Sequence, residues 1–238
     1  MKKLLAFTLA ETLIVMGVIG IVSALTLPNL NSSAGDKERV AKVKKIYQNL
    51  NDAFGRAEAV YGPYEEWFIN DGDDGEAKAK RAGERISEFM KIQKNCGTRT
   101  TGCFASGNPY KINGEDAGNN SNFNALTTDY KFITADGSSV AMRVRDEITI
   151  YVDIDGPNKG SYTYGKDVFE FKIFNDVGLV TYGYNKSISE LITDSTTGWG
   201  NHLATWIINY DNADYLKLNS SGKCPNGTTP TEANPRCK

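Results

Sequence analysis

Hydrophobic and polar residues divide the chain into three regions with different patterns. From residue 12 to residue 30 there is no charged residue, and most positions are Leu, Ile, Val, Ala or Met. A helix of about 20 such residues crosses a bilayer core of roughly 30 Å, so this run predicts a membrane-spanning helix. Lys2 and Lys3 precede it, which favours a cytoplasmic N-terminus and an extracytoplasmic remainder of the chain.

The second region is amphipathic. After a polar, flexible stretch at residues 29–35, apolar residues recur in steps of three and four, as on one face of a helix. They are Val40, Val43, Tyr47, Leu50, Phe54, Ala57 and Tyr61. Gly62-Pro63 then gives the expected stop signal. Because the apolar stripe covers only about three heptads, we expect it to dock on a sheet rather than to form a coiled-coil seam.

Basic residues cluster at the start of this amphipathic helix: Lys37, Arg39, Lys42, Lys44 and Lys45. Such a cluster is most often a solvated helix face. Contact with lipid headgroups or with a neighbouring subunit is the alternative interpretation.

The third region, residues 63–238, has the alternating pattern of a strand-containing head domain. Strands are predicted over residues 130–134, 138–144, 147–154, 168–174 and 177–182. Asp136-Gly137 and Asn175-Asp176 provide turn signals between neighbouring strands. Together they predict an antiparallel sheet with one face in water. The expected fold class is α+β, with a long N-terminal helix, transmembrane and then amphipathic, packed on this sheet.

Other segments of the head carry weaker signals. Residues 76–94 predict a second, shorter helix around Ile86, Phe89, Met90 and Ile92. Leu203, Trp206, Ile207 and Tyr210 predict a late helix or strand that completes the core. The Gly- and Asn-rich residues 106–121 are expected to form a surface loop.

Composition excludes one class of partner. The net charge of −2 and the pI near 5.6 argue against a general nucleic-acid-binding protein, which is usually basic. We therefore expect no clear nucleic-acid partner.

Glu11 decides between three interpretations of the N-terminus. A secretory signal peptide with small residues at Val22-Ser23-Ala24, an uncleaved anchor and a prepilin leader all fit the apolar run. A carboxylate near a bilayer centre costs about 2.5–3.5 kcal/mol on insertion scales, and ionisable groups there usually have a function. Signal peptides and simple anchors do not need such an acid, whereas a filament subunit does.

Residues 6–15, Ala-Phe-Thr-Leu-Ala-Glu-Thr-Leu-Ile-Val, resemble the cleavage and methylation site of type IV prepilins and type II secretion pseudopilins. In that family a membrane peptidase cuts before the Phe and methylates the new amine. The resemblance implies a leader of residues 1–6, a cut between Ala6 and Phe7, and a methylated Phe7. The residue before the cut is usually Gly in the family and is Ala6 here.

The resemblance also implies how the segment would work. Residues 7–30 would form the transmembrane and filament-core helix, and residues 31–62 the amphipathic helix. Glu11 would face the amine of a neighbouring subunit and set the axial register, since either charge alone is penalised in an apolar environment. Gly20 and Pro28 match the family's helix-loosening residues; Pro28 is interpreted either as a marker of the membrane exit or as a site of local melting.

The implied function is that of a structural subunit, a minor pilin or pseudopilin, and not an enzyme. Its partners would be homologous subunits, the prepilin peptidase and methyltransferase, an inner-membrane assembly platform and membrane lipid. The protein would be a single-pass inner-membrane protein before assembly and part of a cell-surface or periplasmic filament afterwards. Pilus, secretion and DNA-uptake filaments remain open, and a membrane-anchored or secreted protein with a binding or enzymatic function is the alternative.

All four cysteines, Cys96, Cys103, Cys224 and Cys237, follow the apolar run and would lie in an oxidising compartment. Four cysteines permit several connectivities, and sequence proximity favours Cys96–Cys103 and Cys224–Cys237. The second disulfide would close a C-terminal loop.

An oxygen-rich turn, with Asp153, Asp155 and Asn158 followed by Asp167, is a candidate calcium site, and the family resemblance supports the idea. A turn stabilised by Asp and Asn side chains at the end of a strand is the favoured alternative.

The only histidine is His202, and no nucleophile motif surrounds it. We therefore expect a surface or capping imidazole.

Overall fold

The computed structural model describes residues 9–68, 72, 74–99, 101–160, 162–174 and 176–237; of these, the side chains of Glu11 and residues 23–33 are not described. The chain divides into two compact units, Met1–Glu38 and Arg39–Lys238. The second unit is the head domain, and each unit is described by itself.

The helix α1 (Leu9–Tyr61) is continuous along the backbone. It includes Pro28 and the polar residues 29–35, so the interruption expected there is absent. Inside a helix Pro costs about 3 kcal/mol and Gly about 1 kcal/mol relative to Ala. The strong helical segments on both sides offset this cost. The predicted stop is confirmed, because α1 ends at Tyr61 and Gly62 takes a positive φ of 80°. Within the described residues, no helix combines the length and the apolar character that crossing a bilayer requires.

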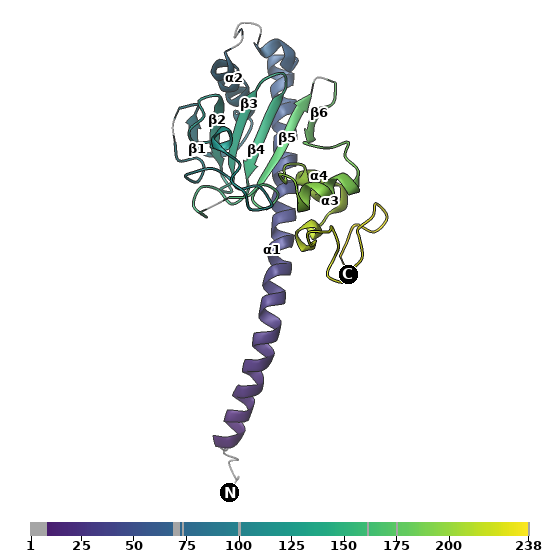
Figure 1. The fold of residues 1–238 in the computed structure, drawn as a ribbon. Coiled ribbons are helices and arrows are strands. Elements are labelled where there is room, and N and C mark those ends of the chain that lie inside the picture. The colour runs from purple at the N-terminus through teal and green to yellow at the C-terminus, as the bar shows by residue number, and fades with distance from the viewer. Residues whose placement is uncertain are drawn as a thin grey trace. The chain divides into compact units, whose positions relative to one another are not determined.

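The head domain is built on an antiparallel sheet of six strands that follow one another in chain order from β1 to β6 (Figure 1). The strands are β1 (Ile92–Gly97), β2 (Asp129–Thr134), β3 (Ser139–Val144), β4 (Ile148–Asp153), β5 (Val168–Phe174) and β6 (Gly178–Thr181). The five strands predicted from alternation are therefore confirmed as β2 to β6. The turn at Gly137, with φ 90°, lies between β2 and β3 as predicted.

One face of the sheet, which we call the helix face, carries the main core. The amphipathic part of α1 packs on this face, and Val43, Leu50 and Ala57 are completely buried there. The ring of Tyr47 stacks on Phe171 of β5 with the ring centroids 5.7 Å apart. Docking of the helix on a sheet is thus confirmed. The helix face also receives the 3-10 helix η1 (Tyr64–Phe68) and α2 (Gly75–Ser87).

The prediction for residues 76–94 is wrong at its C-terminal end. The helix α2 is capped by Asp74 and ends at Ser87, whereas Ile92 begins β1, opposite Thr134 of β2. Local periodicity cannot distinguish a short apolar run in a helix from one in a strand. Pairing with β2 decides the matter, because it satisfies the backbone groups of residues 92–97.

The opposite face, which we call the loop face, is also covered, so the expectation of one face in water is wrong. Residues 101–128 and 162–167 lie over it with little regular structure and form a second core. Phe104, Phe123 and Tyr162 from these segments pack against Ala141 and Val168 of the sheet. The Gly- and Asn-rich loop predicted at residues 106–121 belongs to this cover, and Ala117 within it is buried.

Two short helices complete the domain. The helix α4 (Leu203–Tyr210) confirms the late element, and Trp206 is completely buried in the main core. The helix α3 (Ile188–Thr196) was not predicted from the sequence, although Ser187 and Glu190 form a capping box at its start.

Candidate functional site

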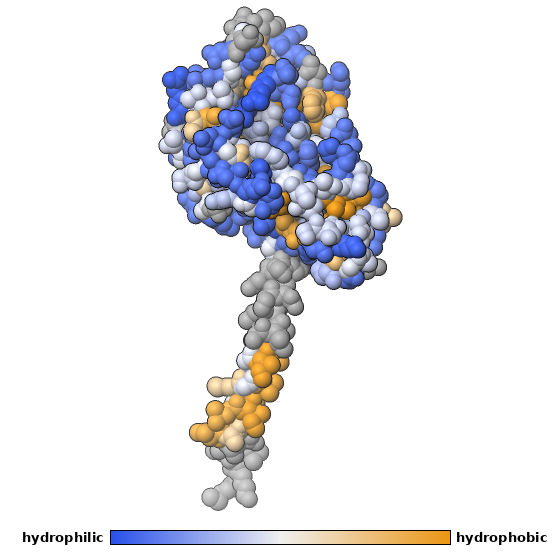
Figure 2. All heavy atoms as spheres, viewed as in Figure 1, coloured by the Kyte–Doolittle hydropathy of each residue, from blue (hydrophilic) through white to orange (hydrophobic). Residues whose placement is uncertain are grey.

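The first unit contains a helical surface that carries large apolar side chains in all directions, although its sequence includes Glu11 and Thr12. We call residues 9–22 of α1 the apolar helix surface. Its nine large apolar side chains are each between 53% and 79% exposed in the isolated chain: Leu9, Leu13, Ile14, Val15, Met16, Val18, Ile19, Ile21 and Val22. Figure 2 shows them as an almost continuous hydrophobic surface on the side in view. A helix that is apolar all round is normally buried in a protein or a membrane.

Two glycines, which have no side chain, lie within the apolar helix surface and leave open space beside the backbone. A Cβ atom added at Gly17 or Gly20 would meet no atom within 4 Å. Small residues of this kind let the backbones of neighbouring helices approach closely. Gly20, which the sequence analysis singled out, therefore lies where a second helix can contact α1.

The structure describes only part of the remaining predicted assembly motif. Ala6 and Phe7 lie outside the described residues. Glu11 and Pro28 belong to the helical backbone of α1, but their side chains are not described. The cleavage site and the Glu11 contact stay predictions.

The basic cluster at the start of the second unit is not simply a solvated face. Arg39 Nε donates to the carbonyl of Lys166 at 2.7 Å. Three lysines of α1 form ion pairs with loops of the head: Lys42–Asp155, Lys44–Asp211 and Lys45–Asp136, with N–O distances of 2.9, 2.6 and 2.9 Å. These contacts join α1 to three separate loops, while Lys37 and Lys45 remain exposed to solvent, as expected for a solvated face.

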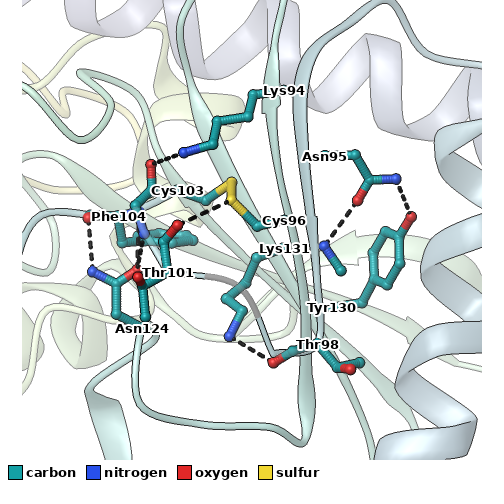
Figure 3. Close-up of a disulfide and its surroundings, with 12 residues drawn as sticks. Lys94, Asn95, Cys96, Thr98, Thr101, Cys103, Phe104, Asn124, Tyr130 and Lys131 are labelled. Carbon is teal, nitrogen blue, oxygen red and sulfur yellow. Dashed lines mark hydrogen bonds between the residues drawn. A yellow bond between two sulfur atoms is a disulfide. The ribbon is translucent and has the colours of Figure 1, made fainter.

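Both predicted disulfides are present. The S–S distances are 2.08 Å for Cys96–Cys103 and 1.99 Å for Cys224–Cys237. The first closes a short loop between β1 and the cover of the loop face (Figure 3), and the second closes the C-terminal loop as expected.

A completely buried lysine lies beside the first disulfide. Lys131 of β2 donates from Nζ to the carbonyl oxygens of Thr98 and Leu126, each at 2.9 Å, and Figure 3 shows the bond to Thr98. Burial lowers the pKa of this ammonium group. Its two acceptors are backbone groups of the irregular cover, so Lys131 fixes that segment to the sheet.

A buried ion pair lies on the same face. Arg143 donates from Nε and Nη2 to the two carboxylate oxygens of Asp129, at 2.6 and 2.7 Å. Burial alone would lower the pKa of Arg143, but the bonds to Asp129 raise it overall. The sequence analysis missed these charged residues. Their signal was the alternation of Lys131 and Arg143 with apolar neighbours in the predicted strands; Asp129 lies just before the first of these strands.

The candidate calcium residues are close in the chain but serve other contacts. Asp153 Oδ1 accepts from the backbone N–H groups of Asp155 and Gly156, at 3.1 and 3.2 Å. Burial raises the pKa of Asp153 to about 7. These bonds form the Asp-stabilised turn that was the alternative interpretation.

The remaining members of the set have contacts of their own or are exposed. Asp155 Oδ1 pairs with Lys42 and Lys159, Asp167 Oδ2 accepts from the N–H of Thr163, and Asn158 is exposed. In the part of the chain that is described, no group of three or more His, Cys, Asp or Glu side chains is arranged to hold a metal ion. Asp153 Oδ2 is buried without a hydrogen-bond partner among the described residues, and calcium binding stays a prediction.

His202 lies at the start of α4, half-buried. Its Nδ1 is 3.4 Å from Asp194 Oδ2, and its ring lies on Tyr182 with the centroids 4.5 Å apart. The carboxylate of Asp194 also accepts from the backbone N–H groups of Gly200 and His202. Asp194 therefore orders the turn between α3 and α4.

No protein-family model, no curated protein and no solved structure matches this chain.

Proposed function

We propose that this chain is a structural subunit of a type IV pilus or type II secretion filament. It is cut between Ala6 and Phe7 and assembles through the N-terminal part of α1. The observation that carries the proposal is the apolar helix surface, which is exposed in all directions in the isolated chain.

Exposure of this surface to water costs so much free energy that another molecule must cover it. Full burial of one large aliphatic side chain is worth about 1.5–3 kcal/mol, so the nine exposed side chains of residues 9–22 represent on the order of 10–20 kcal/mol. That amount exceeds the total stability of many domains. Lipid covers the surface while the subunit is in the inner membrane, and helices of neighbouring subunits cover it in the filament.

Glu11 favours a filament over a simple anchor. A lone carboxylate in an apolar helix is costly. The amine of Phe7, created by the cut, provides a positive charge that a neighbouring subunit can bring to Glu11. Only the correct axial stagger neutralises both charges, so the pair selects one register.

The head domain supports an extracytoplasmic location. Its two disulfides persist in an oxidising compartment. The apolar stripe of α1 from Val40 to Ala57 is buried in the core of the head domain. The apolar helix surface is not part of that core and is available for neighbouring subunits.

Mass spectrometry of the mature N-terminus tests the cut. The protein is isolated from its native host and from a strain without prepilin peptidase. We expect an N-methylated Phe7 in the first and an intact Met1 in the second. A chain that begins at Leu25 would instead indicate an ordinary secreted protein, and an uncut chain in both strains would indicate an anchor.

A variant of Glu11 tests the register. Glu11→Ala should remain in the membrane but lose incorporation into filaments, measured in the sheared fraction. The matched control is Glu65→Ala, which removes an acid from the head and should assemble normally. Normal assembly of Glu11→Ala would overturn the proposed role of this carboxylate.

A further inference from the structure

An open cavity of about 310 Å³ lies on the loop face of the sheet, above β3, β4 and β5. Its lining includes Arg145, Tyr151, Tyr164, Glu170, Trp199 and Asn201. The cover of the loop face leaves this part of the sheet open. Filament assembly through α1 makes no use of it.

One part of the cavity wall is aromatic. Tyr151, Tyr164, Tyr182 and Trp199 contribute rings to it, and Trp199 lies at 6.2 Å from Tyr164, edge to face. Trp199 is 42% exposed, whereas the other two tryptophans, Trp67 and Trp206, are buried. Lys111 Nζ lies over the Trp199 ring, 4.8 Å from its centroid. The other face of the ring is therefore the one that can offer a flat apolar surface to a ligand.

The other part of the wall consists of polar and charged side chains. Glu170 is buried in the wall of the cavity, and Asn201 lines the same cavity. Arg143 and Lys172 are held by Asp129 and Glu147. These groups are fixed in place before any ligand arrives, which lowers the entropy cost of binding.

Several groups at the cavity have bonding capacity left over. Among the residues that the structure describes, the guanidinium of Arg145, the hydroxyls of Tyr151 and Tyr182, and the indole N–H of Trp199 make no hydrogen bond or ion pair. Donors and acceptors that converge on a cavity next to aromatic rings are typical of a small-molecule site.

This combination matches a sugar ring. A pyranose has an apolar C–H face that packs on aromatic rings and a rim of hydroxyls that need both donors and acceptors. A carboxylate and an amide can each bond two neighbouring hydroxyls. The volume of about 310 Å³ is at the small end of ligand pockets, which suits one ring with part of a second.

Three larger cavities lack this combination. One of about 410 Å³ shares Arg143 and Arg145 with the cavity on the loop face but has no aromatic residue among the described residues that line it. In a cavity of about 550 Å³ beside α1, four of the charged lining side chains are already paired, Lys45 with Asp136 and Arg56 with Asp52. Phe89 is the one aromatic residue of its described lining. A cavity of about 860 Å³ is lined mainly by Asn, Gly and Ser residues, and Tyr110 is its only aromatic residue.

We propose that the cavity on the loop face binds one pyranose unit of a saccharide, and that Arg145 favours an acidic sugar. Trp199 stacks on the ring, Glu170 and Asn201 bond its hydroxyls, and Arg145 pairs with a sugar carboxylate at the rim. The head would then recognise surface or extracellular polysaccharide, independently of how the chain assembles.

Tryptophan fluorescence tests the site directly. The full chain is purified in a detergent without a sugar headgroup and titrated with the methyl glycosides of glucose, galactose, mannose, N-acetylglucosamine and glucuronic acid. We expect at least one sugar to change the emission of Trp199, and glucuronide to bind about threefold more tightly than glucoside, because Arg145 is exposed. Calorimetry on the same samples confirms binding.

Variants assign the effect to the cavity. Trp199→Ala should weaken binding about tenfold, and Arg145→Ala should abolish only the preference for glucuronide. Tyr184→Ala removes an aromatic residue that is 46% exposed outside the cavity and should bind like the parent. Glu170→Gln should also weaken binding; if it does not fold by near-ultraviolet circular dichroism, the two surface variants decide. Absence of binding to every sugar, or unchanged binding by Trp199→Ala, would overturn the proposal.

Discussion

On the helix face of the sheet, α1 and α2 close the core with apolar side chains in regular helices. On the loop face, irregular chain segments close it, and a disulfide, a buried lysine and a buried Arg–Asp pair hold them in place. The difference follows from backbone hydrogen bonding. A helix satisfies its own backbone groups before it packs, whereas an irregular segment brings carbonyl groups that need partners.

The comparison indicates which kind of substitution should destabilise each face of the head domain. The helix face depends on shape, because its contacts are apolar and closely packed. The loop face depends on specific partners, because removal of one member of a buried polar pair leaves the other unsatisfied. Five changes test this contrast.

The largest effect is expected on the loop face at Asp129. Asp129→Ala leaves the Arg143 guanidinium buried without its carboxylate, which should cost about 3–5 kcal/mol of unfolding free energy. Lys80→Ala breaks an exposed pair with Glu84 and should change stability by less than about 0.5 kcal/mol. Chemical denaturation measures both, and equal effects would contradict the contrast.

Stability should also depend on pH through Glu170. Burial raises the pKa of this carboxyl to about 7 in the folded protein, above its usual value near 4.5. A raised folded pKa means that the stabilisation is complete below about pH 4.5 and is lost as pH rises through 7, with an upper bound of about 3 kcal/mol. Glu170→Gln mimics the protonated acid, so we expect the decline of the melting temperature from pH 5 to pH 8 to become shallower. A slope identical to that of the parent would count against this assignment.

Loss of the Cys96–Cys103 disulfide should have an intermediate effect. Replacement of both cysteines by Ala should cost about 2–3 kcal/mol, since the closed loop is short. Hydrogen exchange should rise over residues 101–128 before it rises in α1. Uniform exchange across both faces would show that the disulfide does not act locally on the cover.

On the helix face, addition of a single methyl group should lower the stability of the protein at one glycine and raise it at another. A Cβ at Gly83 of α2 would lie 2.1 Å from Tyr130 Cδ1, so Gly83→Ala should cost about 1–3 kcal/mol through overpacking. Gly55 of α1 has no atom within 4 Å of an added Cβ. Gly55→Ala should stabilise the protein by about 0.5–1 kcal/mol through helix propensity. Thermal melts of the two variants should therefore shift in opposite directions.

The smallest effect is expected from calcium removal. Asp155 already pairs with Lys42 and Lys159, so a chelator should leave the melting temperature unchanged. A calcium site in this turn would be established by a different result: the chelator lowers the melting temperature, added calcium reverses this change, and the Asp155→Asn variant shows no such response.

The helix face was largely predictable, and the loop face was not. The stripe from Val40 to Ala57 and the strands β2 to β6 repeat with periods that local sequence displays. Residues 101–128 have no such period, so nothing in the sequence showed that Phe104 and Phe123 would cover the sheet. For the same reason, the cavity with Trp199 and Glu170 could not be assembled from positions far apart in the chain.

The sequence by itself determined the apolar N-terminal run, the amphipathic stripe and the positions of β2 to β6, and it favoured the observed cysteine pairs. Each of these depends on residues near one another in the chain. Tertiary structure decided which charges are buried, what covers the second face of the sheet and where α2 gives way to β1. Those outcomes depend on which distant segment supplies the partner for a backbone or side-chain polar group. The partners of Lys131 and Arg143 became identifiable only once the chain was folded.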